Sequence, residues 1–302
     1  TTIEGDIIYG VSIRQWRKLI NMSRLRILIN CSMKTTVKGE NIAYMFSDII
    51  SDPVKNPIME KYEDSAILDE SGRQTPYLFY NDNNFVSAHR VTVNVVELMK
   101  DRGDMRLPKI ADVVLRISNP TEADKQDLSK YAGVIPNPGP TNDTNNSGSM
   151  DTGDQSRINS KWNLNMTGPN HMAAGYAEQE FIIAEAILRG WITGDMKKHY
   201  ENGISAAYKF LDVPTSDLNA YMSNQKVKIN DADTPTVKLK KIITEKYLNF
   251  FMNAGFEAYF ELRRTGYPDF MEFLPHQHIT YIYNDGYLPL RYQYPANEVT
   301  HN

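Results

Sequence analysis

The clearest pattern of hydrophobic and polar positions lies in residues 174–211. Apolar side chains recur there at every third or fourth position in two runs, which Gly190 separates. This spacing places them on one face of each of two α-helices. Asp195 precedes the second run as an N-cap would, and small residues such as Gly203 let the helices approach closely. The segment therefore predicts a helical hairpin like those of tetratricopeptide repeats.

Three further segments show helical periodicity, at residues 12–30, 91–100 and 237–253. Alternating patterns typical of strands are sparse. Residues 118–160 are rich in Asn, Pro, Gly, Ser, Asp and Thr, which predicts a long polar loop. The expected fold is mainly α-helical, with long ordered loops and little strand, and 302 residues would suit one large domain or two ordinary ones.

The composition narrows the classes of protein that this chain can represent. Hydrophobic residues make up 41% of the 302 residues, which is enough for a core. Lys and Arg number 33 against 37 Asp and Glu, and this net charge of −4 gives no electrostatic footprint for nucleic acid or an anionic membrane. No run of about eighteen apolar residues is present, so no transmembrane helix is expected.

The start of the chain has two unusual features. It opens at Thr1 without Met or a signal peptide, and its first helical pattern begins almost at once, so we expect that preceding sequence is missing. The single cysteine, Cys31, excludes an internal disulfide and a multi-cysteine zinc site. Its surroundings faintly resemble a lipobox, but Arg24 and Arg26 interrupt the apolar stretch that a signal peptide needs. Cys31 is therefore expected to be a buried thiol at a helix end.

Signatures of catalysis are few. The chain contains no dinucleotide-binding glycine motif, no phosphate-binding loop, no H-E-x-x-H and no G-x-S-x-G. His276 and His278 would share one face of an extended segment and could seat a metal, but no third ligand is indicated and surface histidines are the simpler interpretation. A glycosidase is recognised by the separation of two carboxylates in space, which the sequence does not supply.

Residues 143–154 contain a pattern similar to a calcium-binding loop. Oxygen-bearing side chains stand at positions 1, 3, 5, 9 and 12 of an EF-hand-like loop, with Gly148 at the sharp turn. These residues are Asp143, Asn145, Ser147, Asp151 and Asp154. Position 12 is Asp rather than the longer Glu, and no helix is predicted on either side. The pattern thus predicts either a structural calcium site or a solvated flexible loop.

A series of short segments, in order along the chain, carries a family resemblance. They are Asp6-x-x-Tyr9, Trp16-x-Lys18, Ser23-Arg-Leu-Arg26, Asp104-Met-Arg106-Leu107, Glu180–Gly190 with Tyr200-x-Asn202-Gly203, Glu245-Lys-Tyr247, Glu257-Ala-Tyr259 with Glu261-x-Arg263-Arg264-Thr-Gly266, Leu288-Pro-x-Arg291, and Tyr294-Pro-x-Asn297-Glu298. Together they resemble the SusD/RagB-like family of Bacteroidetes outer-membrane lipoproteins, with Met105 where the family usually has Pro. The resemblance spans residues 6–298 and would correspond to about the C-terminal three fifths of a full-length member.

The resemblance implies a binding protein rather than an enzyme, with residues 1–302 in a single SusD-like domain, a superhelix of paired α-helices that would lack its N-terminal part. Members of the family are lipid-anchored at the cell surface and cover a SusC-like TonB-dependent transporter. They capture oligosaccharides, or peptides in some members, and deliver them for import. Several members also bind structural calcium. By this resemblance the chain would need no other cofactor, and it would meet the membrane only through a lipid anchor that this sequence does not contain.

Sugar recognition suggests three ligand-binding segments, because sugars offer apolar ring faces and hydroxyl edges to aromatic and polar side chains. The candidate residues are Arg73, Tyr77, Tyr80, Asn81, Asn84 and Phe85 in the first, Trp162 and Asn163 in the second, and Tyr283 in the third. The alternative is that these aromatic residues only pin loops against the helical layer.

Two other functions stay open, a carbohydrate-active enzyme such as a glycoside hydrolase and a helical-repeat scaffold for protein interactions. Several conspicuous residues are interpreted as structural instead. Arg263, Arg264, Glu257 and Glu261 would form a charge network at one helix end. Trp16 and Trp191 would pack between helical hairpins.

Overall fold

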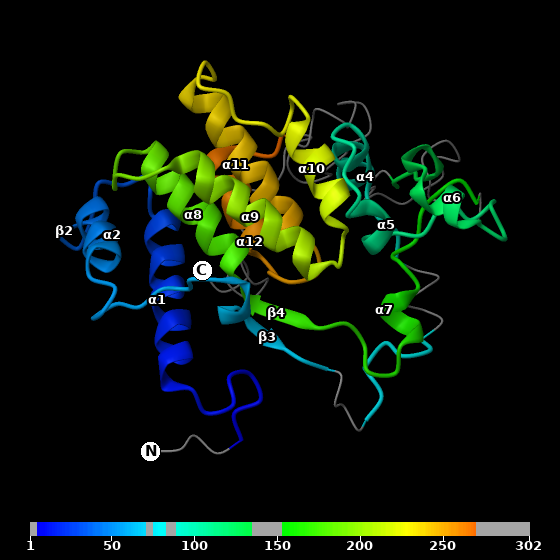
Figure 1. Ribbon diagram of the computed structural model, residues 1–302, viewed down its shortest axis with the longest axis horizontal. Helices are drawn as coiled ribbons and strands as arrows, with labels where there is room; N and C mark the ends of the chain where they lie inside the picture. Colours follow the sequence, from blue (N-terminus) through cyan, green and yellow to red (C-terminus); the bar gives the residue numbers. More distant parts are fainter. Residues whose placement is uncertain (1–4, 71–74, 83–88, 135–152, 270–302) are drawn as a thin grey trace, which may run out of the picture.

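The computed structural model describes residues 5–70, 75–82, 89–134 and 153–269. The described chain is mainly helical, as predicted (Figure 1). Its longer helices are α1 (Ile13–Asn30), α2 (Ile42–Ser51), α4 (Val93–Lys100), α8 (Tyr176–Leu188), α9 (Met196–Phe210), α10 (Thr215–Ser223), α11 (Pro235–Asn249) and α12 (Glu257–Thr265). The short ones are α5 (Leu107–Ile110), α6 (Glu122–Gln126), α7 (Lys161–Leu164) and the 3-10 turns η1 (Tyr62–Asp64) and η2 (Leu128–Lys130). No helix in these ranges is long and apolar enough to cross a membrane.

Helix α8 is the centre of the fold. It forms the predicted hairpin with α9 and also packs against α1 and α11 (Figure 1). Ten of its residues are buried, including the charged residues Glu178, Glu180 and Glu185. Asp195 caps α9 as expected, because its side chain accepts a hydrogen bond from the backbone N–H of Lys198. Charged side chains on a helix that is buried on nearly every side must pair with groups inside the protein, because an unpaired buried charge is costly.

The α8–α9 pair approaches closely at Gly203. A Cβ atom built there would lie 2.6 Å from the ring of Phe181 on α8, so only glycine fits at this position without a shift of the ring. The same hydrophobic cluster continues through Tyr200 and Ile204 to Tyr221 on α10 and Ile242 on α11. A second cluster joins α1 and α2 to α8, and a third joins α4 and α5 to the end of α11.

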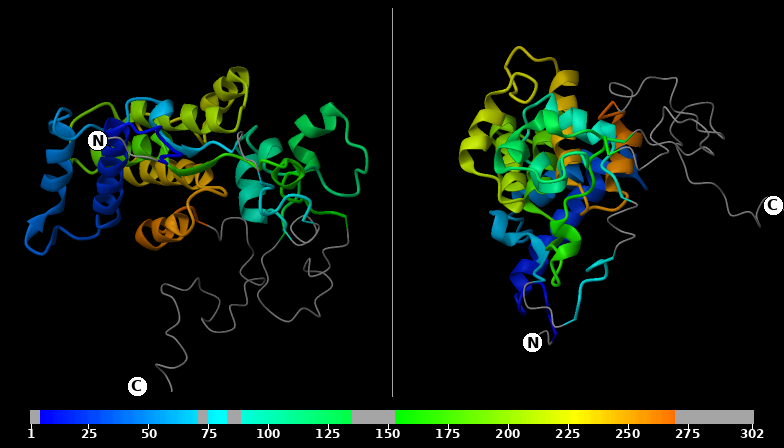
Figure 2. Two further views of the ribbon diagram at one scale, coloured as in Figure 1. Left: turned by 90° about the horizontal axis from the view of Figure 1, so that it is seen from below. Right: turned by 90° about the vertical axis from the view of Figure 1, so that its right-hand side faces the viewer.

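Strands are few in the described ranges and occur as two-stranded ribbons. β1 (Thr36–Val37) pairs with β2 (Glu40–Asn41), and β3 (Ala66–Leu68) pairs antiparallel with β4 (His171–Ala174). The second ribbon joins segments about a hundred residues apart and lies below the helical layer in Figure 1; seen from below, in the left view of Figure 2, it runs across that layer. It thereby brings the chain around residue 75 close to the chain around residue 165.

Most of the predicted boundaries hold within two to four residues. The segment 12–30 forms α1, 91–100 forms α4 and 237–253 forms α11. In the polar stretch 118–160, the described parts contain α6 and η2, and isolated bridges such as Thr92 with Val134 tie them to the rest of the fold. Cys31 is at the end of α1, as predicted, but it is only half-buried. The expectation of a buried thiol is therefore wrong, because Cys31 packs only at the edge of the hydrophobic cluster that α1 forms with α2 and α8.

Candidate functional site

The segment around Asp104 and Arg106 forms a buried ionic network. The Arg106 guanidinium pairs with Asp104 at 2.7 Å and with Glu245 of α11 at 2.8 Å, and all three side chains are almost wholly buried. Tyr208 of α9 donates a hydrogen bond to Asp104 at 2.8 Å, and Tyr221 of α10 donates one to Glu245. Burial alone would lower the pKa of Arg106, but these carboxylates raise it well above its usual range. The network therefore connects the segment of residues 104–106 to α9, α10 and α11.

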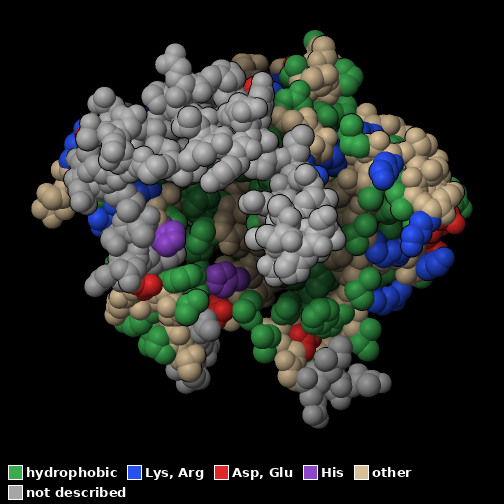
Figure 3. Space-filling view, turned by 180° about the vertical axis from the view of Figure 1, so that it is seen from behind, with side chains coloured by type: hydrophobic (Ala, Val, Ile, Leu, Met, Phe, Trp, Pro, Cys, Tyr) green, Lys and Arg blue, Asp and Glu red, His purple; other side chains and the backbone are tan. Residues whose placement is uncertain are grey.

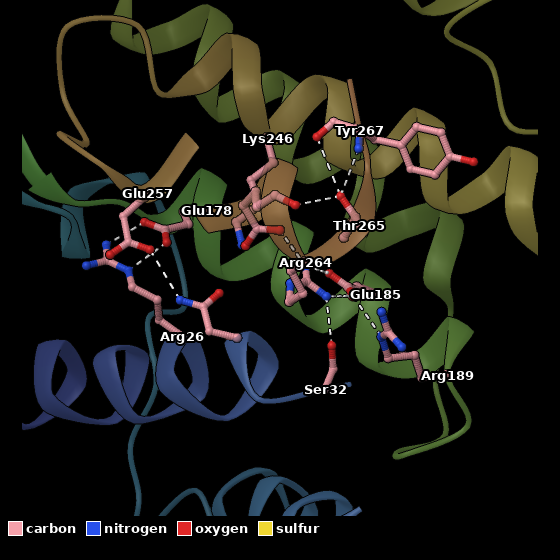
Figure 4. Close-up of polar contacts among 12 residues, drawn as sticks. Arg26, Ser32, Glu178, Glu185, Arg189, Lys246, Glu257, Arg264, Thr265 and Tyr267 are labelled. Carbon is pink, nitrogen blue, oxygen red and sulfur yellow. Dashed lines mark hydrogen bonds and ion pairs between the residues drawn. The ribbon is translucent and has the colours of Figure 1, made fainter. Parts of the chain in front are cut away.

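A second network joins α12 to α1, α8 and α11 (Figure 4). Arg264 pairs with Glu185 of α8 and with Glu261 on its own helix, while Lys246 of α11 donates to Glu261 at 2.6 Å. Burial would raise the pKa of Glu261, but Lys246 and Arg264 lower it. Beside this network, Arg26 of α1 forms a two-pronged pair with Glu178, with N···O distances of 2.7 and 2.6 Å.

The first residues described form a third network around Asp6. Its carboxylate accepts hydrogen bonds from the backbone N–H groups of Ile8, Tyr9 and Val11 and from the Trp16 indole. The hydrogen bond from Tyr9 and the others in this set lower the pKa of Asp6 to about 2. Two residues beyond Trp16 on α1, Lys18 pairs with Asp64 at 2.7 Å and with Glu60 at 2.8 Å.

These networks explain what the motifs of the sequence do. The charged motif residues Lys18, Asp104, Arg106, Glu245 and Glu261 are buried and paired, so they hold helices together rather than face a ligand. The structural interpretation of Glu261 and Arg264 agrees with this geometry. Trp191 also packs as expected, with its ring 5.6 Å from that of Phe46 on α2. Trp16 differs in that its ring nitrogen is also a hydrogen-bond donor in the Asp6 turn.

Two of the segments predicted to bind ligand lie side by side in the structure. The backbone N–H of Tyr77 donates to the carbonyl of Met166 at 2.7 Å, and that of Asn81 donates to the carbonyl of Asn163 at 2.9 Å. Residues 75–82 and 161–171, which we call the aromatic loop pair, therefore form one surface. Sequence proximity could not reveal this pairing, because the β3–β4 ribbon brings the two segments together.

Within the aromatic loop pair, Tyr77 and Trp162 are buried, which corrects the expectation that their rings face a ligand. Tyr77 packs edge-on against Phe79 with ring centroids 5.5 Å apart, and a Cβ at Gly168 would lie 2.5 Å from its ring. Gly168 also has a φ of +73°, which suits glycine. Trp162 is 2% exposed and packs on Phe251 after α11. Both rings support the surface from beneath, as the alternative interpretation expected.

Asn163 is buried as well, and its side chain shows an unusual feature. The side-chain oxygen of Asn163 and the indole nitrogen of Trp162 have no hydrogen-bond partner. Buried polar atoms are nearly always paired with protein or water. Both atoms lie beneath the surface of the aromatic loop pair.

The exposed part of the aromatic loop pair contains aromatic, amide and aliphatic groups. Phe79 and Tyr80 are half-buried, and Asn81 is exposed with a φ of +55° that asparagine tolerates. Leu78 is 79% exposed and Leu164 62% exposed. Neither leucine could be predicted as a surface residue, because no sequence pattern around them indicates that apolar side chains point outward. An arrangement of this kind can hold an apolar ring face while the amide bonds to hydroxyl groups.

The remaining predicted residues lie outside the described ranges. These are Arg73, Asn84, Phe85 and Tyr283 of the ligand segments, the proposed calcium ligands Asp143, Asn145, Ser147 and Asp151, and the pair His276 and His278. Asp154 is described, and it is exposed and paired with Arg116. Across the described ranges no group of three or more His, Cys, Asp or Glu side chains could hold a metal ion.

Two small cavities occur among the helices. One of about 70 Å³ lies between α4, α11 and α12, and one of about 10 Å³ lies beside Arg106. Pockets for small molecules usually measure about 300–1,000 Å³. From behind, apolar side chains also gather in a hollow of the surface (Figure 3). These two cavities among the described residues are therefore too small for an oligosaccharide, whereas the aromatic loop pair is an open surface.

Comparison with known proteins shows the family. Residues 1–295 match the SusD-like family described as starch-binding and associating with the outer membrane. This chain belongs to that family of outer-membrane-associated binding proteins. No curated protein sequence matches the chain.

Solved structures show the same fold. An outer membrane protein of Bacteroides vulgatus linked to nutrient binding is 29% identical, with a TM-score of 0.84 over 99% of this chain and 64% of its own. A SusD homologue of Bacteroides fragilis is also 29% identical, with a TM-score of 0.80 over 100% of this chain and 64% of its own. A chitin-binding protein is 25% identical, with a TM-score of 0.72 over 99% and 62%. The chain thus spans less than two thirds of the length of these relatives.

Proposed function

We propose that this protein captures oligosaccharides at the outer-membrane surface and delivers them to a SusC-like TonB-dependent transporter, without chemical change to the sugar. The observation that carries the proposal is the aromatic loop pair in a member of a starch-binding family. Tyr80 and Asn81 would contact the sugar directly, and Tyr77 and Trp162 would hold them in place. A lipid anchor would keep the protein at the cell surface.

The buried carboxylates of the Arg106 network are not placed for glycoside hydrolysis. A glycosidase needs two accessible carboxyl groups about 5–9 Å apart across a cleft. Asp104 and Glu245 flank one position, but Arg106 fills it and both carboxylates are buried. A turnover assay on a panel of polysaccharides is expected to yield no product. Release of reducing ends by the purified protein would favour the hydrolase instead.

Replacement of Tyr80 by alanine is expected to weaken oligosaccharide binding about tenfold or more, because a sugar ring would lose its aromatic platform. The measurement is calorimetric titration with maltooligosaccharides and chitooligosaccharides, chosen from the family description and the chitin-binding relative. Tyr44→Ala is the matched control, since Tyr44 is exposed on α2 far from the loops. Equal loss in both variants, or none in Tyr80→Ala, would place the site elsewhere.

A structural calcium ion at residues 143–154 stays a separate proposal. The chemistry of that segment suits a hard cation, although the one ligand in the described ranges, Asp154, is already paired with Arg116. Titration with calcium and then with a chelator, with and without oligosaccharide, measures it. Heat released in the wild type and lost in Asp151→Asn would support the ion. Identical titrations with and without chelator would leave the segment a solvated loop.

A further inference from the structure

The aromatic loop pair carries a cation at the end where Asn81 lies. Lys161 is the first residue of its second segment, and Asn163, two residues further on, accepts the backbone hydrogen bond from Asn81 at 2.9 Å. The Lys161 side chain is exposed, and its Nζ atom lies 5.9 Å from the centre of the Trp162 ring. A lysine over an aromatic face packs its aliphatic stem there while its ammonium group reaches the surface. The charge of Lys161 therefore borders the surface to which Tyr80 and Asn81 belong.

A second lysine, Lys109 of α5, lies in the segment next to Lys161. Asn159 joins the two segments through hydrogen bonds. Its backbone N–H donates to the carbonyl of Ile110 at 2.9 Å, and its side-chain amide donates to the carbonyl of Pro108 at 3.0 Å. Its side-chain oxygen accepts from the backbone N–H of Lys161 at 3.0 Å. Because Lys109 stands between the two residues that bind Asn159, the fold holds two lysines from distant parts of the chain in neighbouring segments.

The charges of these two lysines repel each other. The surrounding protein desolvates the ammonium group of Lys161 and lowers its pKa below the usual value, and the charge of Lys109 lowers this pKa further. Asp212, after α9, opposes the shift without forming an ion pair with Lys161. Among the described residues neither lysine forms an ion pair, and the carboxylate of the loop pair, Asp82, has an interaction partner of its own. The positive charge is thus only partly balanced at this end of the surface.

We propose that the aromatic loop pair binds acidic oligosaccharides, with an anionic group of the sugar held by Lys161 and Lys109. This inference rests on the proposed capture of oligosaccharides and names their class. An anion at this position would be attracted by both ammonium groups and would relieve their repulsion. Lysine is a flexible point charge without the planar fork of arginine, so the carboxylate of a uronic acid and a sulfate ester offer it the same chemistry.

The lysines are the part of the surface that distinguishes acidic sugars from neutral ones. An aromatic ring such as that of Tyr80 and an amide such as that of Asn81 recognise ring faces and hydroxyl groups, which both kinds of sugar present. Oligomers of starch and chitin are uncharged and would leave Lys109 and Lys161 without a partner. Complementary charge contributes to specificity more than to affinity, so its effect is measured as a preference between matched ligands.

The test is calorimetric titration of the whole protein in low salt with oligomers of galacturonate, of mannuronate and of sulfated galactose. Each has a matched neutral ligand, the methyl ester of the uronates and the unsulfated galactose oligomer, in which the charge is lost and the sugar chain is kept. We expect at least one acidic oligomer to bind about tenfold more tightly than its neutral counterpart. The preference should shrink at about 1 M salt, where the Debye length is about 3 Å. Which acidic oligomer binds identifies carboxylate or sulfate as the group.

Replacement of Lys161 by glutamine should weaken binding of the acidic oligomer about threefold to tenfold and leave binding of its neutral counterpart unchanged. Lys161→Arg keeps the charge and should retain the preference. The matched control is Lys198→Gln, which removes the same charge from an exposed position in the first turn of α9. Circular dichroism would establish that the three variants are folded.

The outcomes separate this inference from the proposed function. If neutral oligomers, including those of starch and chitin, bind as tightly as the acidic ones, the inference is overturned while the capture of oligosaccharides stands. The same holds if Lys161→Gln and Lys198→Gln bind the acidic oligomer equally. If the wild type binds no sugar, neutral or acidic, both the inference and the proposed function are overturned.

Discussion

Replacement of Arg106 by alanine is expected to lower the free energy of unfolding by about 3–5 kcal/mol, the largest effect of any single substitution considered for this protein. The guanidinium is wholly buried and neutralises Asp104 and Glu245, which are also buried. Without it, two carboxylates would stay in the interior with no cation beside them, and only the hydroxyl groups of Tyr208 and Tyr221 and the backbone N–H of residue 106 would remain as donors. The measurement is urea denaturation followed by circular dichroism.

Arg116→Ala provides the control for this experiment, since Arg116 pairs with Asp154 at the surface. Exposed pairs contribute about 0–1 kcal/mol, so this variant should unfold close to the wild type. If the two variants lost a similar free energy of unfolding, burial would not explain how much the Arg106 network contributes to stability. The denaturation needs no added oligosaccharide, because neither arginine belongs to the aromatic loop pair.

Replacement of Gly203 by alanine is expected to destabilise the protein by about 1–3 kcal/mol through crowding of the α8–α9 contact. The new methyl group would lie 2.6 Å from the Phe181 ring, which is itself fully buried. The sign of the change in the free energy of unfolding is informative, because at an unobstructed helix position the same substitution stabilises a protein by about 1 kcal/mol. Thermal unfolding of the variant measures the effect.

A double variant shows whether the crowding is the cause. Phe181→Leu removes the ring and should itself destabilise the core, but the further change Gly203→Ala should then cost less than it does in the wild type. Ser205→Ala, at a half-buried position on the same helix, is the control for a general change in helix stability. A stabilised Gly203→Ala protein would contradict the close approach of the two helices.

The helical class could be predicted because its signal is local. The apolar spacing around α8 and α9, the cap at Asp195 and the glycine at 203 all act within a few turns of helix. The family motifs were also visible, although their role was not. Asp104 and Glu245 are 141 positions apart in the chain, and only their common partner Arg106 explains why both are acidic.

The candidate site could be predicted only in part. Composition indicated the aromatic segments around Tyr80 and Trp162, but it could not indicate which rings face outward. The answer depends on burial: Trp162 lies beneath the surface against Phe251, whereas Leu78 lies on it. Burial is a property of the packed chain, since each side chain is covered by residues distant in sequence.

The sequence by itself therefore determined the helical class, the α8–α9 hairpin and the resemblance to the SusD-like family, because these depend on residues close together in the chain. Only the tertiary structure decided that the motif charges are internal pairs, that residues 75–82 and 161–171 share one surface, and that α1 leaves Ile13, Ile20 and Ile27 exposed. The physical reason is common to all three. Each depends on which distant segment covers a side chain, and the free energy of burial and charge pairing is set by that covering segment.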